Sequence, residues 1–221
     1  MTRVLVLRPE PGASATVKRA RELGLDAAAI PLFHVEPVAW RAPDPAGFDG
    51  LLLTSANAIR HGGEQLPRLR GLKVYAVGKA TAEAGRAAGF DVSATGDSGV
   101  DALVRSIEPD FKLLHLCGAD RRDAAEAHQD ITSIEVYRSQ PLPAPDVRNI
   151  QGSIALIHSP RAGRRFSDLV DDKTSIRIAA LSRAAADAAG DGWMSVDAAE
   201  QPNDEALLAL AASLCNNSQP K

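Results

Sequence analysis

Cysteine is scarce in this chain, because only two of its 221 residues are cysteines. Cys117 and Cys215 lie far apart and form no CxxC pair, which argues against a disulfide framework and against a cysteine metal site. Histidines do not compensate, since none of the five makes an HxxxH or HxH pair. His115 and His158 fall in strand-like apolar runs and are interpreted as core or edge residues. The sequence therefore predicts no bound metal.

Aromatic residues, an excess of one charge and long apolar runs are also lacking. Aromatics make up 4% of the chain, the net charge is −3, and the basic residues are dispersed, so we expect no nucleic-acid partner. No apolar run approaches the ~20 residues that span a membrane. The glycines form neither GxxxxGK[ST] nor GxGxxG, so nucleotide-binding motifs are absent.

The start of the chain and its surface pattern suggest where the protein acts. The chain enters the strand-like run Val4–Leu7 without a cationic leader, and we expect a cytoplasmic protein that does not bind membranes. No long apolar surface stripe is evident, so a monomer is expected.

Short aliphatic runs alternate with segments of helical spacing along the chain. The runs include 4–7, 51–53, 73–77, 113–116, 154–157 and 176–181. Strands that alternate with helices indicate βα units and parallel sheets, and continuous apolar runs are typical of strands covered on both faces. The sequence therefore predicts an α/β fold.

An internal repeat divides this pattern into two copies. The segment 54–58 resembles 158–162, and 74–82 resembles 178–186. Ser159 lies 104 positions after Ser55, and Ser182 lies 104 positions after Gly78. The segment 30–37 resembles 134–141 in the same register. One shared offset across these segments indicates two related lobes.

The order of the repeats indicates a permutation. A βα unit at Val4 to about Gly24 comes first in one copy, and its counterpart at Leu113 to about His128 comes last in the other. We therefore predict a discontinuous lobe of residues 1–34 and 142–221, and an inserted lobe of residues 38–135. Linkers at about 34–38 and 136–141 would join them as two extended strands, with a ligand site expected where the lobes meet.

Several motifs in this arrangement resemble the uroporphyrinogen-III synthase family. They are Leu-Thr-Ser-Ala-Asn-Ala at 53–58, Val-Gly-Lys-Ala-Thr-Ala at 77–82, Glu-Val-Tyr at 135–137 and His-Ser-Pro-Arg-Ala at 158–162. The resemblance spans almost the whole chain. It implies two flavodoxin-like lobes with parallel sheets, joined by a two-stranded linker. It also implies a carbon–oxygen lyase without a metal or organic cofactor, which dehydrates and cyclises hydroxymethylbilane to uroporphyrinogen III while inverting the last pyrrole ring.

The same resemblance marks Tyr137 as the candidate catalytic residue. The family's linker tyrosine is expected near the leaving hydroxyl, where a phenol can donate a proton to departing hydroxide. The alternative is a tyrosine that only packs on the linker. Phe33, at the matching position of the other linker, shows that an aromatic there needs no chemical role.

Hydroxyls and backbone groups that follow strands are the candidate substrate-binding residues. Thr54 and Ser55 follow one strand and Ser159 follows its counterpart, where they can contact substrate or simply cap a helix. Gly78 permits close approach of a ligand to the backbone, and Thr81 offers a hydroxyl, unless the two form a routine strand-to-helix turn.

Two further candidates are less regular. Ser182 stands where the family usually has glycine, and Ala185 stands where it often has threonine, so hydroxyl contact from this lobe is weaker. Arg8 can pair with a substrate carboxylate through two parallel hydrogen bonds, or can form a salt bridge between the lobes.

Two other functions remain open at this point. Two α/β lobes with a double hinge also describe a non-enzymatic module that binds a small ligand or regulates a partner. The departures at Ser182 and Ala185 also suit a family member that has lost its activity.

Overall fold

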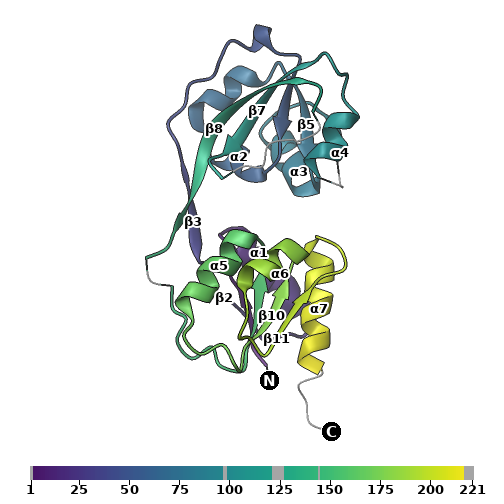
Figure 1. Ribbon diagram of the computed structural model, residues 1–221. Helices are drawn as coiled ribbons and strands as arrows, with labels where there is room; N and C mark the ends of the chain where they lie inside the picture. Colours follow the sequence, from purple (N-terminus) through teal and green to yellow (C-terminus); the bar gives the residue numbers. More distant parts are fainter. Residues whose placement is uncertain (1, 97–98, 121–126, 144, 217–221) are drawn as a thin grey trace. The chain divides into compact units, whose positions relative to one another are not determined.

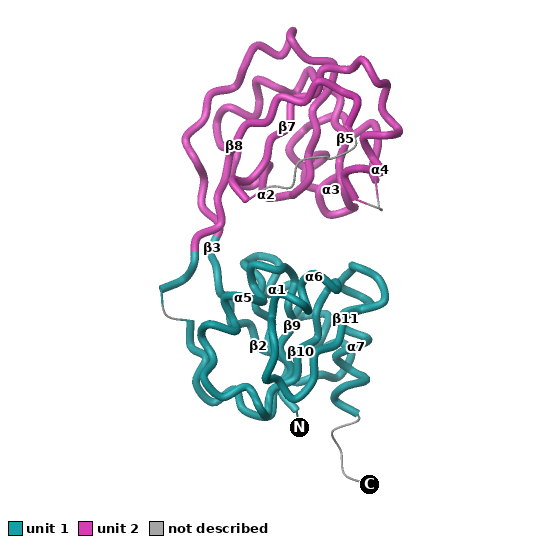
Figure 2. The backbone as a smooth tube through the Cα atoms, viewed as in Figure 1, with its two compact units in different colours: residues 1–34, 141–221 teal, residues 35–140 magenta. Residues whose placement is uncertain are grey.

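The chain folds into a mixed α/β structure with two separate sheets, which confirms the predicted fold class (Figure 1). This computed structural model describes residues 2–96, 99–120, 127–143 and 145–216. Cα-contact clustering gives two compact units, namely residues 1–34 with 141–221 and residues 35–140, hereafter unit 1 and unit 2 (Figure 2).

The sheet of unit 1 has the order β11-β10-β9-β1-β2, and its strand pairs are parallel. Its strands are Val4–Val6 (β1), Ala27–Ala29 (β2), Ile154–Ile157 (β9), Arg177–Ala180 (β10) and Ser195–Ala198 (β11). Its helices are Gly12–Glu22 (α1), Pro160–Leu169 (α5), Arg183–Ala189 (α6) and Asp204–Asn216 (α7). Counted in chain order, the strands lie as 2-1-3-4-5, which is the flavodoxin-like order.

The sheet of unit 2 has the order β3-β8-β7-β4-β5-β6. Its strands are Phe33–Pro37 (β3), Gly50–Leu53 (β4), Lys73–Val77 (β5), Val92–Gly96 (β6), Lys112–Gly118 (β7) and Asp130–Pro141 (β8). Its helices are Ala56–His61 (α2), Lys79–Ala87 (α3) and Val100–Arg105 (α4), with 3₁₀ turns at Pro45–Gly47 and Gly63–Leu69.

The strands of the two sheets lie in the same spatial order, but the chain begins each sheet at a different position in that order. In unit 2, β7 and β8 hold the places that β1 and β2 hold in unit 1, while β4, β5 and β6 correspond to β9, β10 and β11. Sheet topology therefore shows the permuted order that the repeat indicated. Part of the segment expected to form a helix after β7, residues 121–126, lies outside the described residues.

Aliphatic side chains explain why these runs form central strands. Leu5 of β1 packs in one core cluster with Phe166 and Ile178, while Val4 and Val6 pack on the opposite face with Leu207. The period of two buries a strand on both faces, as parallel sheets between helices require. Helices accordingly cover both faces of the unit 1 sheet (Figure 1).

Extended strands mark the passages between the units. Within unit 2, the Val38 N–H donates to the Val136 carbonyl at 3.0 Å, next to the ion pair of Arg138 with Glu36. Within unit 1, the Leu142 N–H donates to the Leu32 carbonyl at 3.0 Å.

Arginines of α5 hold the unit 1 end of these strands. Arg165 donates to the Leu32 carbonyl at 3.2 Å and also to the Leu142 carbonyl. The guanidinium of Arg161 lies 4.6 Å from the ring centre of Phe33. The chain is thus fixed where it leaves unit 1 and where it returns.

Candidate functional site

Each sheet has a point at which the chain changes direction across the strand order. In unit 2 this point lies between β7 and β4, and in unit 1 it lies between β1 and β9. Ligands of open α/β sheets bind beyond the carboxyl ends of the strands at such points. At these two points lie the residues that follow β4 and β9, those that end β7 and those that follow β1.

Tyr137 lies on β8 beside the end of β7, where its register partner is Gly118. A Cβ atom on Gly118 would lie 2.6 Å from Tyr137 Cε2 and 2.7 Å from Cζ, so only glycine lets the ring occupy this position. His61, the last residue of α2, presents its ring with the centroid 6.3 Å from that of Tyr137. The tyrosine is thus packed against two elements and half-buried.

The surroundings of Tyr137 keep its phenol protonated. Burial raises the pKa of Tyr137, a side-chain hydrogen bond with Ser55 lowers it, and Cys117 and Asp120 raise it further. Burial and then the charge of Arg60 lower the pKa of His61. Near neutral pH this pair therefore consists of a neutral phenol, which can donate a proton, and an uncharged imidazole.

Ser55 begins the helix that carries His61. It has extended backbone angles (φ −154°, ψ 140°), and its hydroxyl accepts a hydrogen bond from the Asn57 N–H at 3.2 Å. Ser55 is therefore the N-cap of α2 and at the same time a neighbour of Tyr137.

Thr54 is held by a residue that the sequence did not single out for function. Its Oγ1 lies 3.0 Å from His115 Nε2, and Ser133 Oγ lies 3.4 Å from the other ring nitrogen. His115 is 3% exposed and stands between leucines on β7. It is a core residue, as interpreted, but one that makes a polar bridge from β8 to the end of β4. Only its histidine identity in an aliphatic strand could have signalled this.

Gly78 follows β5, the neighbour of β4, and Thr81 lies in the first turn of α3. Gly78 has φ 81°, a left-handed conformation that favours glycine, and its N–H donates to the Gly96 carbonyl at 2.8 Å. Thr81 is 5% exposed on α3. The structure thus places the backbone turn at the sheet edge and buries the threonine side chain.

Unit 1 repeats the serine caps. Ser159 follows β9 and its hydroxyl accepts from the Ala162 N–H at 3.2 Å, while the Ser182 hydroxyl accepts from the Ala185 N–H at 3.3 Å. Ser182 thus caps α6 where the equivalent Gly78 bends the backbone of unit 2.

Arg8 pairs with a carboxylate of its own unit. Arg8 Nη1 donates to Asp204 Oδ1 at 3.2 Å, and Thr16 Oγ1 donates to Oδ2 at 2.9 Å. His158 Nε2 lies 3.1 Å from Oδ1, and Arg19 also pairs with Oδ2. Asp204 starts α7, so four side chains from α1 and the ends of β1 and β9 converge on one helix start.

This convergence holds Asp204 ionised. Burial raises the pKa of Asp204, but the hydrogen bonds from His158 and Arg19 outweigh it, and the pKa lies far below its usual range. Burial conversely lowers the pKa of His158, although the hydrogen bond with Asp204 opposes this effect. Sequence reasoning missed Thr16, Arg19 and Asp204, because no local pattern connects them.

The predicted site residues thus fall into two groups. Thr54, Ser55 and Tyr137 come together in unit 2, with Gly78 directly after the next strand, β5. In unit 1, Arg8 and Ser159 follow adjacent strands, and Ser182 follows the next one.

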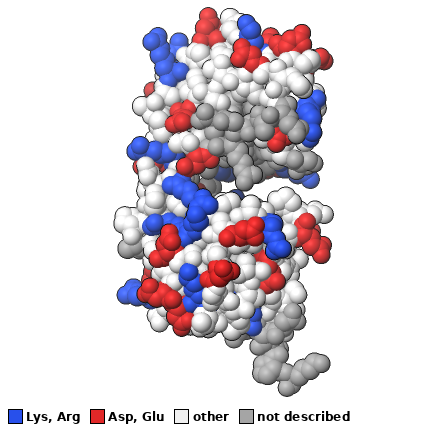
Figure 3. Space-filling model, in the orientation of Figure 1, with Lys and Arg blue, Asp and Glu red and all other residues white. Residues whose placement is uncertain are grey.

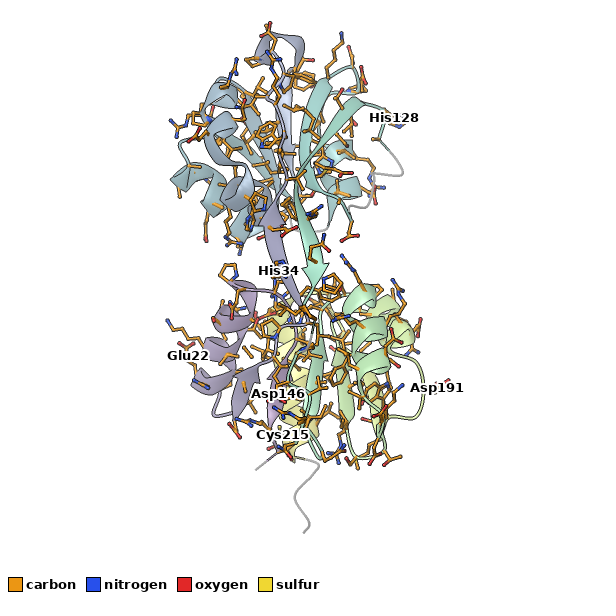
Figure 4. The ribbon with its side chains drawn as sticks, turned by 90° about the vertical axis from the view of Figure 1, so that its left-hand side faces the viewer. Glu22, His34, His128, Asp146, Asp191 and Cys215 are labelled. Atoms are coloured by element: carbon orange, nitrogen blue, oxygen red, sulfur yellow. The ribbon has the colours of Figure 1, made fainter. Side chains whose placement is uncertain are left out.

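Charge and metal-binding groups are spread rather than gathered. On the face shown in Figure 3, acidic and basic side chains both occur on each unit. Among the described residues, no three His, Cys, Asp or Glu side chains are arranged to hold a metal ion. His34 on β3 and His128 before β8 are both exposed (Figure 4). Within the described ranges, no helix combines the length and apolar character needed to cross a bilayer.

Comparisons with known proteins converge on one family. The family model described as uroporphyrinogen-III synthase HemD matches residues 14–209. A curated uroporphyrinogen-III synthase from Chlorobaculum parvum is 33% identical over 92 residues, which cover 38% of this chain and 37% of that protein. The aligned part therefore spans little more than a third of that relative.

Solved structures extend the likeness to the whole fold. Uroporphyrinogen-III synthetase from Helicobacter pylori superposes with a TM-score of 0.69 at 17% identity, over 97% of this chain and 100% of that one. A mutant uroporphyrinogen III synthase from Thermus thermophilus gives a TM-score of 0.55 at 18% identity, over 98% and 100% of the two chains. At these identities the likeness shows a shared fold.

Proposed function

Because the chain belongs to the uroporphyrinogen-III synthase family, we propose that it dehydrates and cyclises hydroxymethylbilane to uroporphyrinogen III. The observation that carries this proposal is the family match across residues 14–209. Tyr137, a half-buried neutral phenol on β8 beside the end of β7, supplies the type of proton donor that loss of a hydroxyl group needs.

The reaction has two parts. The hydroxymethyl oxygen leaves, and one carbon of the last ring then attacks to close the macrocycle. The pyrrole nitrogen pushes electrons toward the hydroxymethyl carbon, the carbon–oxygen bond breaks, and the Tyr137 proton leaves with the oxygen as water. The resulting azafulvene-type cation is attacked by the substituted carbon of the last ring, and a spiro intermediate rearranges to the inverted product. The proton released when the ring regains aromaticity returns to the phenolate, so the tyrosine is regenerated.

Positioning accounts for the rest of the catalysis. The free substrate tends to close head to tail, so the protein must hold the chain in the geometry that gives the inverted isomer. We assign substrate contact to the edge groups Arg8, Thr54, Ser55, Gly78, Thr81, Ser159 and Ser182. Backbone N–H groups and hydroxyls at strand ends suit carboxylates without a strongly basic surface, in keeping with the net charge of −3.

The proposal includes a monomer that acts in the cytoplasm without metal, organic cofactor or nucleic acid. Dispersed basic residues and the absence of GxGxxG and CxxC patterns support it. Activity that survives exhaustive chelation, with the mass of a monomer in solution, is the expected result.

A coupled assay tests the activity directly. Hydroxymethylbilane is generated in place and the product isomers are separated. Isomer III in excess of isomer I is expected. Isomer I alone, formed at the spontaneous rate, would contradict the proposed function and would favour a binding module or an inactive family member.

Replacing the catalytic phenol tests the mechanism. Tyr137→Phe keeps the ring but removes the proton donor, so the rate of isomer III formation should fall by about 100-fold or more. Tyr75→Phe is the matched control, because Tyr75 lies on β5 against Phe111 and should tolerate loss of its hydroxyl. Equal activity of the two variants removes Tyr137 from the mechanism.

A further inference from the structure

A row of polar side chains crosses three adjacent strands of the unit 2 sheet. Thr54 Oγ1, directly after β4, lies 3.0 Å from His115 Nε2 on β7, and Ser133 Oγ on β8 lies 3.4 Å from His115 Nδ1. Leu113, two residues before the buried histidine on the same strand, belongs to an apolar core cluster. Side chains two positions apart share a face of a sheet. The polar row therefore lies between this apolar cluster and the carboxyl edge of the sheet.

The repeat in unit 1 shows that the fold does not require a histidine at this place. His115 pairs with Ser133, and the equivalent pair of unit 1 consists of Val6 on β1 and Ala29 on β2. Ser133 lies 104 positions after Ala29, which is the offset of the repeat. Val6 is 0% exposed and packs in an aliphatic core. A buried imidazole needs partners for its ring nitrogens, whereas valine does not, so packing alone does not account for His115.

We propose that His115 is a positioning residue whose Nε2–H donates to Thr54 Oγ1 and so directs the threonine O–H toward a substrate carboxylate. A hydroxyl oxygen that accepts a hydrogen bond keeps its own proton for another acceptor. This inference rests on the proposed function, because substrate contact by Thr54 is part of that function. The hydrogen bond itself belongs to unit 2 alone and needs no substrate.

The contacts of the two ring nitrogens indicate which of them faces Thr54 with a proton. A neutral imidazole has one N–H donor and one acceptor nitrogen. If Ser133 donates to Nδ1, the ring proton lies on Nε2 and is donated to Thr54. Each donor in such a chain is polarised by the one before it, which strengthens the last O–H as a donor. In the opposite tautomer the Thr54 proton is held by Nε2, and the hydroxyl cannot donate to a carboxylate, which only accepts.

The protonation of the ring nitrogens is measurable in the substrate-free protein. Long-range proton–nitrogen correlation spectra of protein with isotope-labelled histidine distinguish protonated from unprotonated ring nitrogens. The chain has five histidines, and the signals that are lost in His115→Gln belong to His115. We expect His115 Nε2 to carry a proton near neutral pH. An unprotonated Nε2 overturns the proposal.

Two amide variants separate the roles of the two ring nitrogens. A glutamine side-chain nitrogen can lie near the position of imidazole Nε2, whereas that of asparagine lies near Nδ1. His115→Gln should therefore keep a donor to Thr54 and a KM for hydroxymethylbilane close to that of the unaltered protein. His115→Asn should raise KM by about tenfold, the loss of one oriented hydrogen bond to a charged group, with kcat nearly unchanged. Equal KM values for the two variants would contradict the assignment of Nε2.

A merely structural histidine predicts a different result. Its replacement would lower the amount of folded protein, and hence the apparent kcat, without changing KM. His115→Val copies Val6 of unit 1 and adds no unpaired polar group to the core, so it serves where the amide variants do not fold. Ile131→Val is the matched control, because it trims the same apolar cluster on β8 and should leave KM unchanged.

A double-mutant cycle tests whether His115 acts through Thr54. His115→Val should raise KM by about tenfold in the unaltered protein and should not raise it further in a Thr54→Val background, since both changes remove one contact. Equal effects in the two backgrounds overturn the proposal.

Product analysis separates this inference from the proposed function. If isomer III forms and KM is the same in the unaltered protein, His115→Asn and His115→Val, the inference fails and the proposed function stands. If the unaltered protein makes no isomer III, the proposed function fails, and the role of His115 toward a substrate carboxylate fails with it.

Discussion

Asp204 shows how much one side chain can organise. Its carboxylate receives Arg8, Thr16 and His158 as well as Arg19, and these donors come from α1 and from the ends of two adjacent strands. A carboxylate placed this way ties the first residue of α7 to the centre of unit 1. An amide at this position would keep one acceptor oxygen, but it would replace the other with an NH2 donor and remove the negative charge.

We expect Asp204→Asn to lower the free energy of unfolding at neutral pH by about 2 kcal/mol or more, because part-buried cations would lose their counter-charge. The folded pKa of Asp204 is depressed, so its stabilising effect is complete above the unfolded pKa of about 4 and is lost as the pH falls further. Chemical denaturation at several pH values should show the two proteins converging in acid.

Asp146→Asn is the control, because Asp146 is an exposed residue that pairs with nearby Arg148 (Figure 4). Its effect at neutral pH should be clearly smaller. An equal loss of unfolding free energy in both variants would mean that the convergence of four side chains on Asp204 adds nothing to stability.

Contacts of this kind set the limit of sequence reasoning at the residue scale. Arg8 was a candidate because it follows the first strand, but its partner Asp204 is 196 positions away and no local pattern joins them. The Thr54–His115 bond crosses 61 positions for the same reason. The sequence could indicate which residues stand at strand ends, but only the folded sheet shows which of them meet.

At the scale of elements, the central strands were predictable and the edge strands β2, β6 and β11 were not. The runs at 73–77 and 154–157 coincide with β5 and β9, since strands covered on both faces are continuously apolar. The edge strands Ala27–Ala29, Val92–Gly96 and Ser195–Ala198 escaped notice, because they contain alanine or alternate with polar residues and are only partly buried.

The contact of α5 with α6 depends on the missing side chain of Gly163. A Cβ atom there would lie 2.9 Å from both the Ala185 carbonyl oxygen and the Ala189 nitrogen. Gly163→Ala should therefore push the helices apart and lower the unfolding free energy by about 1–3 kcal/mol, despite alanine's better helix propensity. A Cβ atom on Gly71 would meet no atom within 4 Å, so Gly71→Ala should leave the free energy of unfolding nearly unchanged. Thermal denaturation measures both variants. A more stable Gly163→Ala protein would contradict the close packing.

For the whole molecule, the consequence of two sheets is two sets of core residues. Leu156 of β9 is buried with Val4 and Leu207, whereas Leu52, its counterpart 104 positions earlier, is buried with Val104 and Leu113. Neither leucine shares a cluster with residues of the other unit. We therefore expect a core substitution to destabilise its own unit and to leave the other unit folded.

Leu156→Ala should lower the protection of β10 amides by the equivalent of about 2–5 kcal/mol and leave β5 amides protected, while Leu52→Ala should do the reverse. Hydrogen exchange followed by mass spectrometry measures both segments in one experiment. Equal loss in both segments from either variant would show that the molecule unfolds as one cooperative body.

The paired carbonyl and amide at Leu32 and Leu142 have a consequence for how such a chain can be cut and rejoined. Because the chain leaves and re-enters unit 1 at residues in direct contact, a linker of a few residues could join these two points if unit 2 were deleted. The contact between Val38 and Val136 likewise places the two ends of unit 2 next to each other. Either unit could therefore be transferred to another protein with its ends already adjacent.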